Sequence, residues 1–555
     1  MTRGVFLSSL LSGKIISKIS KEDSVVFSGG FLIILKDMIS EGVEAMDNIL
    51  ILDCGSQYTQ LIARRIRELK VHSMILPWDT EFERIMELAP SGIVISGGPQ
   101  SVLDEGTASV PVELFKMDIP VLGLCYGMQL MAKLLGGKVV SGSGREYGRT
   151  AITLEKNFSP ILEDLPGSFE VWMSHGDHIM DLPQDMKLLA STSDGVPAAM
   201  GTSNGMLSGL QFHPEVVHTQ NGMDILSNFL FRVCKCRGDW DLEDWIENMK
   251  GQIHGSTGNT SIICGLSGGV DSTVAAVLTH EAVGDRLECI FVNNGLLREG
   301  EAEEVIENYR KLNLKVHYVD ASDKFINALK NVTDPEKKRK IIGETFIRVF
   351  EAEANKFGQA EWLLQGTLYP DVIESGKIGK GSVVIKSHHN VGGLPEDMDL
   401  EVLEPLKDLF KDEVRKIGKM LGVPSGILSR HPFPGPGLAV RCLGEINSER
   451  LETLRKADRI FDEEIRKAGL YENIWQSFCV LLPVRTVGVM GDSRTYSEVI
   501  ALRAVESQDG MTSDWVRLPS DLLDTVSRRI CNQVPGVNRV VMDVTSKPPS
   551  TIEWE

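Results

Sequence analysis

Along most of the chain, short apolar runs alternate with amphipathic stretches. The runs at 49–52, 92–95 and 121–124 contain only apolar residues and glycine, which is typical of strands buried on both faces of a parallel sheet. The stretches Thr59–Leu69 and Met128–Leu135 repeat apolar residues at i, i+3 and i+4 spacing, which predicts helices. Strands that alternate with helices predict an α/β fold with a parallel sheet.

The same alternation begins again after the polar stretch 254–260 and predicts a second α/β unit. Its first strands are expected at Ser261–Leu266 and Leu287–Val292, with a helix at Thr273–Thr279. Glu374–Gly393 is rich in Gly, Lys, Ser and His and has little periodicity, as in a long functional loop or lid.

Changes in composition divide the chain into four segments. Residues 46–238 and 239–430 are expected to form two parallel-sheet α/β domains, and residues 431–555 a smaller α+β domain. Residues 1–45 are expected to lie outside the catalytic fold, because their short apolar stretches are followed by no small-residue cleavage site. An upstream start-codon assignment would account for this, and a short presequence or a loosely ordered tail is the alternative.

Composition narrows the classes of function. With 58 Lys and Arg against 77 Asp and Glu, the formal net charge is -19, which argues against a broad surface for DNA or RNA. Nucleotides are not excluded, because glycine-rich loops bind phosphate locally whatever the global charge. The nine cysteines are scattered and odd in number, which favours a reducing cytoplasm over a disulfide framework. No apolar run approaches the roughly 20 residues that span a bilayer, so we expect no membrane segment.

A cysteine lies on the turn between an expected strand and an expected helix. The run Gly123-Leu-Cys-Tyr-Gly127 has the G-x-C-x-G form of a nucleophile elbow, and the following helix N-terminus favours the thiolate of Cys125. A lone buried cysteine is usually inert packing. Here, however, His213 and Glu215 lie two residues apart on an extended segment, so both side chains face the same way. Glu215 would orient His213, which deprotonates Cys125.

These residues resemble class I glutamine amidotransferases over about residues 48–236. The motifs that carry the similarity are Ile95-Ser-Gly-Gly-Pro99, Gly123–Gly127 and Gln211-Phe-His-Pro-Glu215. The resemblance implies that glutamine acylates Cys125 and that backbone N–H groups of Gly98 and Tyr126 form the oxyanion hole. Cys54 stands where the family motif leads us to expect phenylalanine, and we interpret it as a packing residue.

A second glycine-rich turn, Ser267-Gly-Gly-Val-Asp-Ser272, follows the strand expected at Ser261–Leu266. Bare backbone N–H groups at the start of a helix form a nest for an anion. The lysine of GxxxxGK[ST] is absent, which argues against a conventional NTPase loop. The run resembles the loop of N-type ATP pyrophosphatases, which bind the β- and γ-phosphates of ATP and adenylylate an acceptor. The ATP contacts that this resemblance implies are Ser267, Gly268, Gly269, Val270, Asp271, Ser272 and Thr273.

Asp271 is also the candidate ligand for the Mg²⁺ that accompanies ATP, since hard cations prefer carboxylate and phosphate oxygens. A carboxylate that only satisfies backbone N–H groups of the first helical turn is the alternative, and the two roles are compatible. At the end of the next strand, Asn293 stands where related synthetases have Asp, which removes a charge from that position. An amidotransferase joined to an adenylylating domain indicates a single enzyme with two coupled reactions, in which glutamine supplies ammonia and ATP activates the acceptor.

Three further stretches resemble the GMP synthetase family, and the resemblance covers about residues 48–555. They are Gln365–Ser375, the lid-like run Ile385–Gly393 and the final run Lys547–Glu555. The resemblance implies that ATP adenylylates XMP with release of pyrophosphate, that ammonia then gives GMP and AMP, and that Lys386 contacts phosphate charge. It implies XMP contacts for Lys547 and Thr551 at the nucleotide phosphate, for Glu553, and for Arg339 and Gln476. It also implies a homodimer formed by residues 431–555.

Other interpretations stay open. The basic run Lys337–Lys340 is equally well read as a solvated helix face. Another adenylylating enzyme, such as a tRNA-modifying thiolase or an NAD-type synthetase, would share the ATP loop. A thiolase would want catalytic thiols near ATP, but Cys264 and Cys289, the nearest cysteines, fall within expected strands. A regulatory homologue without activity is the remaining alternative, and Asn293 is the one departure that favours it.

Overall fold

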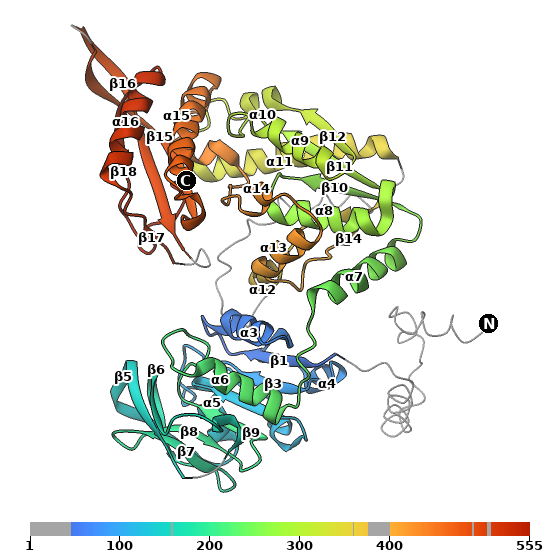
Figure 1. Ribbon diagram of the computed structural model, residues 1–555, viewed down its shortest axis with the longest axis vertical. Helices are drawn as coiled ribbons and strands as arrows, with labels where there is room; N and C mark the ends of the chain where they lie inside the picture. Colours follow the sequence, from blue (N-terminus) through green and yellow to red (C-terminus); the bar gives the residue numbers. More distant parts are fainter. Residues whose placement is uncertain (1–45, 157–158, 359, 376–399, 491–492, 508–511) are drawn as a thin grey trace. The chain divides into compact units, whose positions relative to one another are not determined.

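The computed structural model describes residues 46–555 apart from 157–158, 359, 376–399, 491–492 and 508–511. The described residues form two compact units, of which the first ends at Trp240 and the second runs from Asp241 to Glu555 (Figure 1). Within these described ranges, no helix combines the length and the apolar character needed to cross a membrane.

The first unit is built on a nine-stranded sheet in the order β2-β1-β3-β4-β9-β8-β7-β5-β6. Five strands form its parallel half, namely β1 (Asn48–Asp53), β2 (His72–Pro77), β3 (Gly92–Ile95), β4 (Val121–Leu124) and β9 (Leu207–Leu210). Antiparallel strands extend the sheet, and these are β5 (Lys138–Leu154), β6 (Ser168–Asp181), β7 (Lys187–Thr192) and β8 (Pro197–Gly201). The sequence pattern predicts β1, β3 and β4 of the parallel half and misses β2, β9 and the antiparallel extension.

Helices of this unit follow the strands of its parallel half. They are α3 (Thr59–Glu68), α4 (Phe82–Glu87), α5 (Tyr126–Leu134) and α6 (Gly222–Ser227). The predicted helix Thr59–Leu69 agrees with α3 to one residue. The helix predicted from Met128 begins two residues earlier, because Cys125 is already its N-cap residue and the first turn carries no apolar period of its own.

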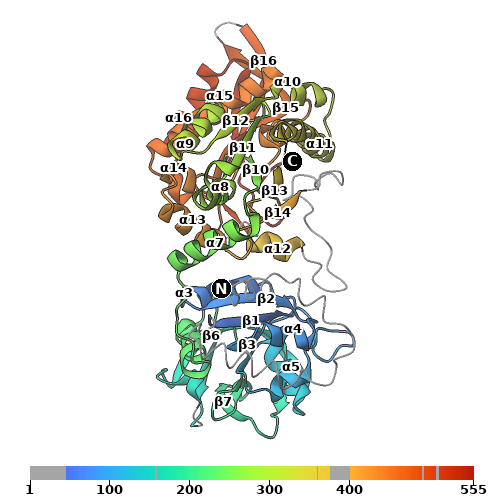
Figure 2. The same ribbon diagram turned by 90° about the vertical axis from the view of Figure 1, so that its right-hand side faces the viewer.

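The second unit contains a parallel five-stranded sheet in the order β12-β11-β10-β13-β14. Its strands are β10 (Ser261–Leu266), β11 (Leu287–Asn293), β12 (Val316–Asp320), β13 (Ala360–Leu364) and β14 (Glu401–Leu403). The helices around it are α7 (Leu242–Thr257), α8 (Val270–Val283), α9 (Glu301–Lys311), α10 (Ser322–Ala328), α11 (Pro335–Ala354), α12 (Tyr369–Ser375), α13 (Lys411–Met420) and α14 (Ser425–Leu428). In Figure 2 this sheet lies between α8 and α11, both of which contact β11. The predicted strands agree with β10 and β11, whereas α8 is longer at both ends than the predicted Thr273–Thr279.

Residues beyond 430 add an α+β part to the same unit. In it β15 (Gln476–Met490) and β16 (Ser493–Glu506) form a long antiparallel pair, β17 (Asp514–Trp515) is antiparallel to β16, and β18 (Val537–Met542) is parallel to β16. Two helices, α15 (Ser448–Lys467) and α16 (Ser520–Gln533), cover these strands. One apolar core joins the two parts, since Ile263 and Ile290 of the parallel sheet belong to the same buried cluster as Phe461 of α15. A domain boundary at residue 430 therefore stays a prediction.

A buried lysine ties the last residue of the chain to this core. Lys338 of α11 is fully buried, so this position of the basic run is not a solvated helix face. Its Nζ donates to the carbonyl oxygens of Ala439 at 3.2 Å and Cys442 at 3.0 Å, and to the carboxylate of Glu555. Arg339 of the same helix donates to the main-chain oxygen of Glu555. A buried ammonium group needs such partners, because desolvation of an uncompensated charge is costly.

We predict that Glu555→Gln lowers the free energy of unfolding of the second unit by about 3 kcal/mol, because the Lys338 charge loses its buried counter-charge. Urea denaturation of the full chain measures this change. The control is Glu336→Gln, since the exposed Glu336 carboxylate lies 3.6 Å from Arg339. An exposed pair of this kind contributes less than about 1 kcal/mol. Equal effects of the two substitutions would contradict the prediction.

Candidate active sites

Cys125 lies on the turn between β4 and α5, with φ 49° and ψ -105°. A positive φ is rare for a residue with a Cβ and marks a strained turn. The flanking glycines leave room for it, because a Cβ on Gly127 would lie 2.3 Å from the carbonyl oxygen of Ile95. A Cβ on Gly123 would lie 2.6 Å from the Gly127 backbone. The Cys125 side chain is therefore held at the start of α5, whose N-terminus favours negative charge.

His213 and Glu215 follow β9, and both are almost fully buried. Nδ1 of His213 lies 2.8 Å from Oε1 of Glu215. The ring of Tyr58 packs edge-on against the imidazole, with 5.0 Å between the centroids. Burial by itself lowers the pKa of His213, but hydrogen bonds to Cys125 and Glu215 and the charges of both groups outweigh it and raise the pKa to about 10. The structure thus brings the three predicted residues together, with an imidazole that holds its proton strongly beside the thiol.

Gly98 lies next to the first residue of α5. A Cβ on Gly98 would be 2.9 Å from the carbonyl oxygen of Cys54 and 3.1 Å from Cγ of Tyr126. This close packing is compatible with an oxyanion hole made of the Gly98 and Tyr126 backbones, a role that stays a prediction. Cys54 is buried, and burial raises the pKa of its thiol, as expected for a packing residue.

Two buried glutamines complete the surroundings of the thiol, and sequence reasoning did not single them out. Nε2 of Gln211 lies 3.6 Å from Sγ of Cys125. The side chain of Gln129 orients this amide, since its Nε2 donates to Oε1 of Gln211 at 3.2 Å and to the carbonyl oxygen of Asp177 at 2.9 Å. Gln129 follows Cys125 by one helical turn and Gln211 precedes His213 by two strand positions, so both spacings carried a signal.

The predicted phosphate loop lies between β10 and α8. Gly268 has φ 76°, a conformation that favours glycine, and Gly269 is the N-cap residue of α8. The N–H of Gly269 donates to Oγ of Ser267 at 3.3 Å, and Oγ of Ser267 lies 3.1 Å from Oγ of Ser272. Oγ1 of Thr273 donates to the carbonyl oxygen of Gly269 at 2.7 Å. The seven predicted residues thus form one turn at a helix N-terminus, the geometry that binds phosphate.

Asp271 lies in the first turn of α8. Its Oδ2 is 3.3 Å from Nζ of Lys411, and its Oδ1 is buried with no hydrogen-bond partner among the described residues. An acceptor left over at a phosphate loop fits a hard cation bound mainly by phosphate oxygens. Across the ranges that the structure describes, no group of three His, Cys, Asp or Glu side chains is arranged to hold a metal by itself.

Asn293, at the end of β11, uses both ends of its amide. Its Nδ2 donates to Oη of Tyr318 at 2.9 Å, and its Oδ1 accepts from the N–H of Gly295 at 3.0 Å. The amide is thus a turn-forming group here, whose donor an aspartate would lack. The predicted lid residue Lys386 lies outside the described residues.

Of the predicted XMP contacts, Gln476 and Glu553 lie together. The Glu553 carboxylate accepts from Nε2 of Gln476 at 2.8 Å and from Arg441 at 2.8 and 3.0 Å. Arg441 is fully buried, and sequence reasoning missed it. Elsewhere, Arg339 contacts the Glu555 backbone, and Oγ1 of Thr551 donates to the carbonyl oxygen of Glu553 at 2.5 Å. Lys547 pairs through its backbone with Ser513, and its side-chain role stays a prediction.

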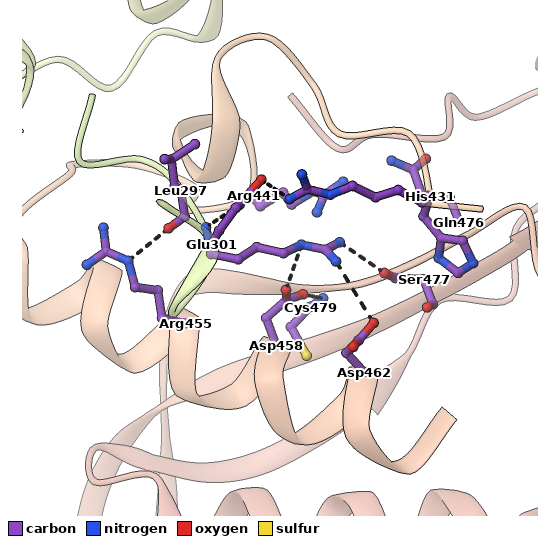
Figure 3. Close-up of polar contacts among 12 residues, drawn as sticks. Leu297, Glu301, His431, Arg441, Arg455, Asp458, Asp462, Gln476, Ser477 and Cys479 are labelled. Atoms are coloured by element: carbon purple, nitrogen blue, oxygen red, sulfur yellow. Dashed lines mark hydrogen bonds and ion pairs between the residues drawn. The ribbon is translucent and has the colours of Figure 1, made fainter. Parts of the chain in front are cut away.

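A polar cluster joins the loop after β11 to the α+β part of the unit (Figure 3). Arg298 of this loop is half-buried and pairs with Asp458 of α15 at 3.2 Å. The second oxygen of Asp458 accepts from the N–H of Cys479 at 2.9 Å. From α15, Arg455 donates to the carbonyl oxygen of Leu297 at 2.9 Å. Two residues of α15 thus hold the loop, and sequence reasoning missed this cluster because its members are far apart in the chain.

Comparison with known families agrees with this division of the chain. Residues 50–233 match the family described as glutamine amidotransferase class-I, residues 241–348 match NAD synthase, and residues 463–554 match the GMP synthase C terminal domain. With these matches, the elbow site and the phosphate loop define a class I amidotransferase joined to an ATP-dependent synthetase.

Curated relatives identify the family within that class. The chain is 56% identical to the glutamine-hydrolysing GMP synthase of Aquifex aeolicus over 507 residues. This alignment covers 91% of this chain and 99% of the relative. The chain is 53% identical to the corresponding proteins of Clostridium tetani and Bartonella henselae, over 91% and 92% of this chain and 99% of each relative. The chain belongs to the glutamine-hydrolysing GMP synthase family.

The raised pKa of His213 predicts a pH-dependent stability of the first unit. Because the folded-state pKa of about 10 exceeds the ordinary value of 6.5, the ionised imidazole contributes stability that is complete below pH 6.5. This contribution is lost as the pH rises through 10. Glu215→Gln removes one cause of the shift, so the variant should melt several degrees below wild type at neutral pH, and the difference should shrink towards pH 10. Thermal unfolding across this range measures it, and a difference that grows with pH would contradict the assignment.

Proposed function

We propose that this chain is an ATP-dependent carbon–nitrogen ligase that converts XMP to GMP with glutamine as the nitrogen donor. The products are GMP, AMP, pyrophosphate and glutamate, and the reaction belongs to purine nucleotide biosynthesis. The observation that carries this proposal is the match to glutamine-hydrolysing GMP synthases over 99% of their length. The elbow site and the phosphate loop on one chain support it with chemistry that such a reaction requires.

Ammonia would be produced at Cys125. The raised pKa of His213 means that the ring keeps the proton of the Cys125–His213 pair. The thiolate left on Cys125 attacks the carboxamide carbon of glutamine to give a tetrahedral intermediate. Backbone N–H groups of Gly98 and Tyr126 would stabilise its oxyanion. The proton on His213 then passes to the leaving nitrogen, ammonia departs, and water hydrolyses the glutamyl thioester. The hydrogen bond that Nδ1 of His213 donates to Glu215 supports this proposal, since it orients the imidazole and stabilises its charged form.

Activation of XMP would take place at the phosphate loop of α8. The loop N–H groups would bind the β- and γ-phosphates of ATP while O2 of XMP attacks the α-phosphorus and pyrophosphate leaves. Ammonia then attacks C2 of the adenylylated XMP and displaces AMP. Lys386 would contribute a positive charge to the departing phosphates.

Mg²⁺ would accompany ATP, and Asp271 is the residue we propose to hold it. The buried Oδ1 without a partner among the described residues supports this role. The ion would supply charge neutralisation of the phosphates. Lys411, which pairs with Oδ2 of Asp271, keeps the carboxylate in place.

XMP would bind beside the final residues of the chain. The residues we propose for this site are Arg339, Gln476, Lys547, Thr551 and Glu553. The joint contact of Gln476 and Glu553 supports a polar site there. Because Arg441 and Gln476 already engage the Glu553 carboxylate, we expect Glu553 to act from a fixed position.

We also propose that the enzyme is a cytoplasmic homodimer. All nine cysteines are free, as in a reducing compartment. The long β15–β16 pair exposes apolar side chains that a partner would cover. These are Val484, Val487 and Val489 of β15 and Tyr496 of β16.

The first test compares GMP formation from XMP, ATP and Mg²⁺ with glutamine or with ammonium chloride. Cys125→Ala should lower glutamine-supported synthesis by about a thousandfold or more, because no thiolate remains, and should leave ammonium-supported synthesis within about twofold. Loss of both activities in this variant would contradict two separate sites. Absence of GMP with either nitrogen source in the wild type would contradict the acceptor assignment.

The dimer proposal is tested on the same surface. Val489 is 74% exposed, and we predict that Val489→Lys converts a sedimenting dimer into a single chain, because a charge would be buried at the contact. Val217→Lys is the matched control, since Val217 is 76% exposed in the first unit. A wild-type sedimentation mass of one chain would contradict the proposal.

A further inference from the structure

Glu301 and Arg430 form an ion pair beside the phosphate loop. Glu301 is the first residue of α9 and is 4% exposed. Its Oε2 accepts from the main-chain N–H of Arg298 at 2.8 Å, and its Oε1 accepts from Arg430. Nη1 of Arg430 donates to the carbonyl oxygen of Gly268 at 3.0 Å. The guanidinium group thus bridges a buried carboxylate and the backbone of the loop.

This contact determines which way one peptide group of the loop faces. A trans peptide is planar, so the carbonyl of Gly268 and the N–H of Gly269 point in opposite directions. The carbonyl points to Arg430, and the N–H points to the other side, where it donates to Oγ of Ser267 at 3.3 Å. That side is exposed at Ser267 and lies at the start of α8, where an anion would approach.

Glycine on both sides leaves this peptide group little restraint of its own. Neither Gly268 nor Gly269 has a Cβ that would oppose rotation of the peptide group, so the carbonyl and N–H can exchange sides at low steric cost. Gly268 also allows the close approach, because a Cβ there would lie 3.2 Å from Nη1 of Arg430. The orientation therefore depends on the hydrogen bond from Arg430.

We propose that the Glu301–Arg430 pair is a positioning device for ATP, which holds the Gly268–Gly269 peptide with its N–H towards the phosphates. The inference rests on the proposed role of this loop in ATP binding. Arg430 acts through the backbone and is not itself a phosphate ligand, since Glu301 neutralises its charge and Gly268 occupies its Nη1. The same carboxylate holds the Arg298 backbone, so the Arg298 loop and the phosphate loop share one anchor.

The test is steady-state synthesis with ammonium chloride in place of glutamine, which bypasses the Cys125 site. Arg430→Gln and Glu301→Gln should each raise the KM for ATP by about tenfold, the factor that loss of one charge-assisted hydrogen bond gives. The kcat and the KM for XMP should stay within about threefold, because these residues do not contact the acceptor. Arg430→Lys keeps the charge and should give an intermediate KM for ATP.

Glu301→Gln separates positioning from direct binding. If Arg430 were a phosphate ligand, removal of its counter-charge would free it and lower the KM for ATP, and this result would overturn the proposal. A KM for ATP unchanged in both variants would also overturn it. If Arg430→Gln does not fold, Glu301→Gln and Arg430→Lys decide by the same criterion.

Glu464→Gln is the matched control for loss of a half-buried ion pair. Glu464 of α15 lies 2.6 Å from Arg529 of α16, with side-chain exposures of 12% and 24%. Its KM for ATP should equal that of wild type, and a rise equal to that of Glu301→Gln would overturn the proposal. Titration of each protein with MgATP distinguishes failure of the proposed ATP-dependent function from failure of the positioning role alone. A wild type that does not bind MgATP contradicts the proposed function, whereas normal wild-type binding with unchanged variants overturns only the positioning role.

Discussion

Both sites depend on one constraint of parallel sheets, which is that a buried strand must turn abruptly into the helix that covers it. At β4–α5 and at β10–α8 this turn leaves backbone N–H groups uncovered at a helix start. In the first unit the turn places the thiol of Cys125 at the N-terminus of α5, and Cys125 adopts a strained positive φ there. In the second unit the turn contains the adjacent glycines Gly268 and Gly269, which carry no side chain. Under the proposed function, one element of architecture would therefore serve nucleophilic chemistry in one unit and anion binding in the other.

In the second unit, buried and half-buried cations connect segments that are far apart in the sequence. Arg298, Lys338 and Arg441 each reach carboxylates more than 100 residues away in sequence. The guanidinium groups of Arg298 and Arg441 also both lie over the ring of Phe433, at 5.3 and 5.1 Å from its centroid. Such pairs add little net stability over apolar packing but strongly disfavour any arrangement that leaves a charge alone. These ion pairs therefore determine how the α+β part packs against the parallel sheet.

Local patterns were sufficient for the first site and insufficient for much of the second. Cys125 could be predicted because its glycines are adjacent, and the His213–Glu215 pair because two residues of extended chain fix their common direction. The parallel strands β1, β3, β4, β10 and β11 could be predicted because burial on both faces gives a nearly continuous apolar run. Glu301 and Arg441 could not, since an isolated charged residue has no periodicity and its partner is set by tertiary packing. The long antiparallel strand β5 was missed for a related reason, as its many glycines and polar residues hide any alternation.

The ion pairs of Glu553 and Glu555 with Arg441 and Lys338 have a consequence for the order in which the two units fold during synthesis. Synthesis proceeds from the first residue to the last, so the 46–240 unit leaves the ribosome more than 300 residues before the buried partners of Arg441 and Lys338 are made. The early unit has every strand of its sheet at that point. Until residues 553 and 555 are made, Arg441 and Lys338 lack the carboxylates that they pair with in the finished structure. Under the proposed function, the unit that produces ammonia would thus be complete in the nascent chain before the unit that uses ammonia can finish folding.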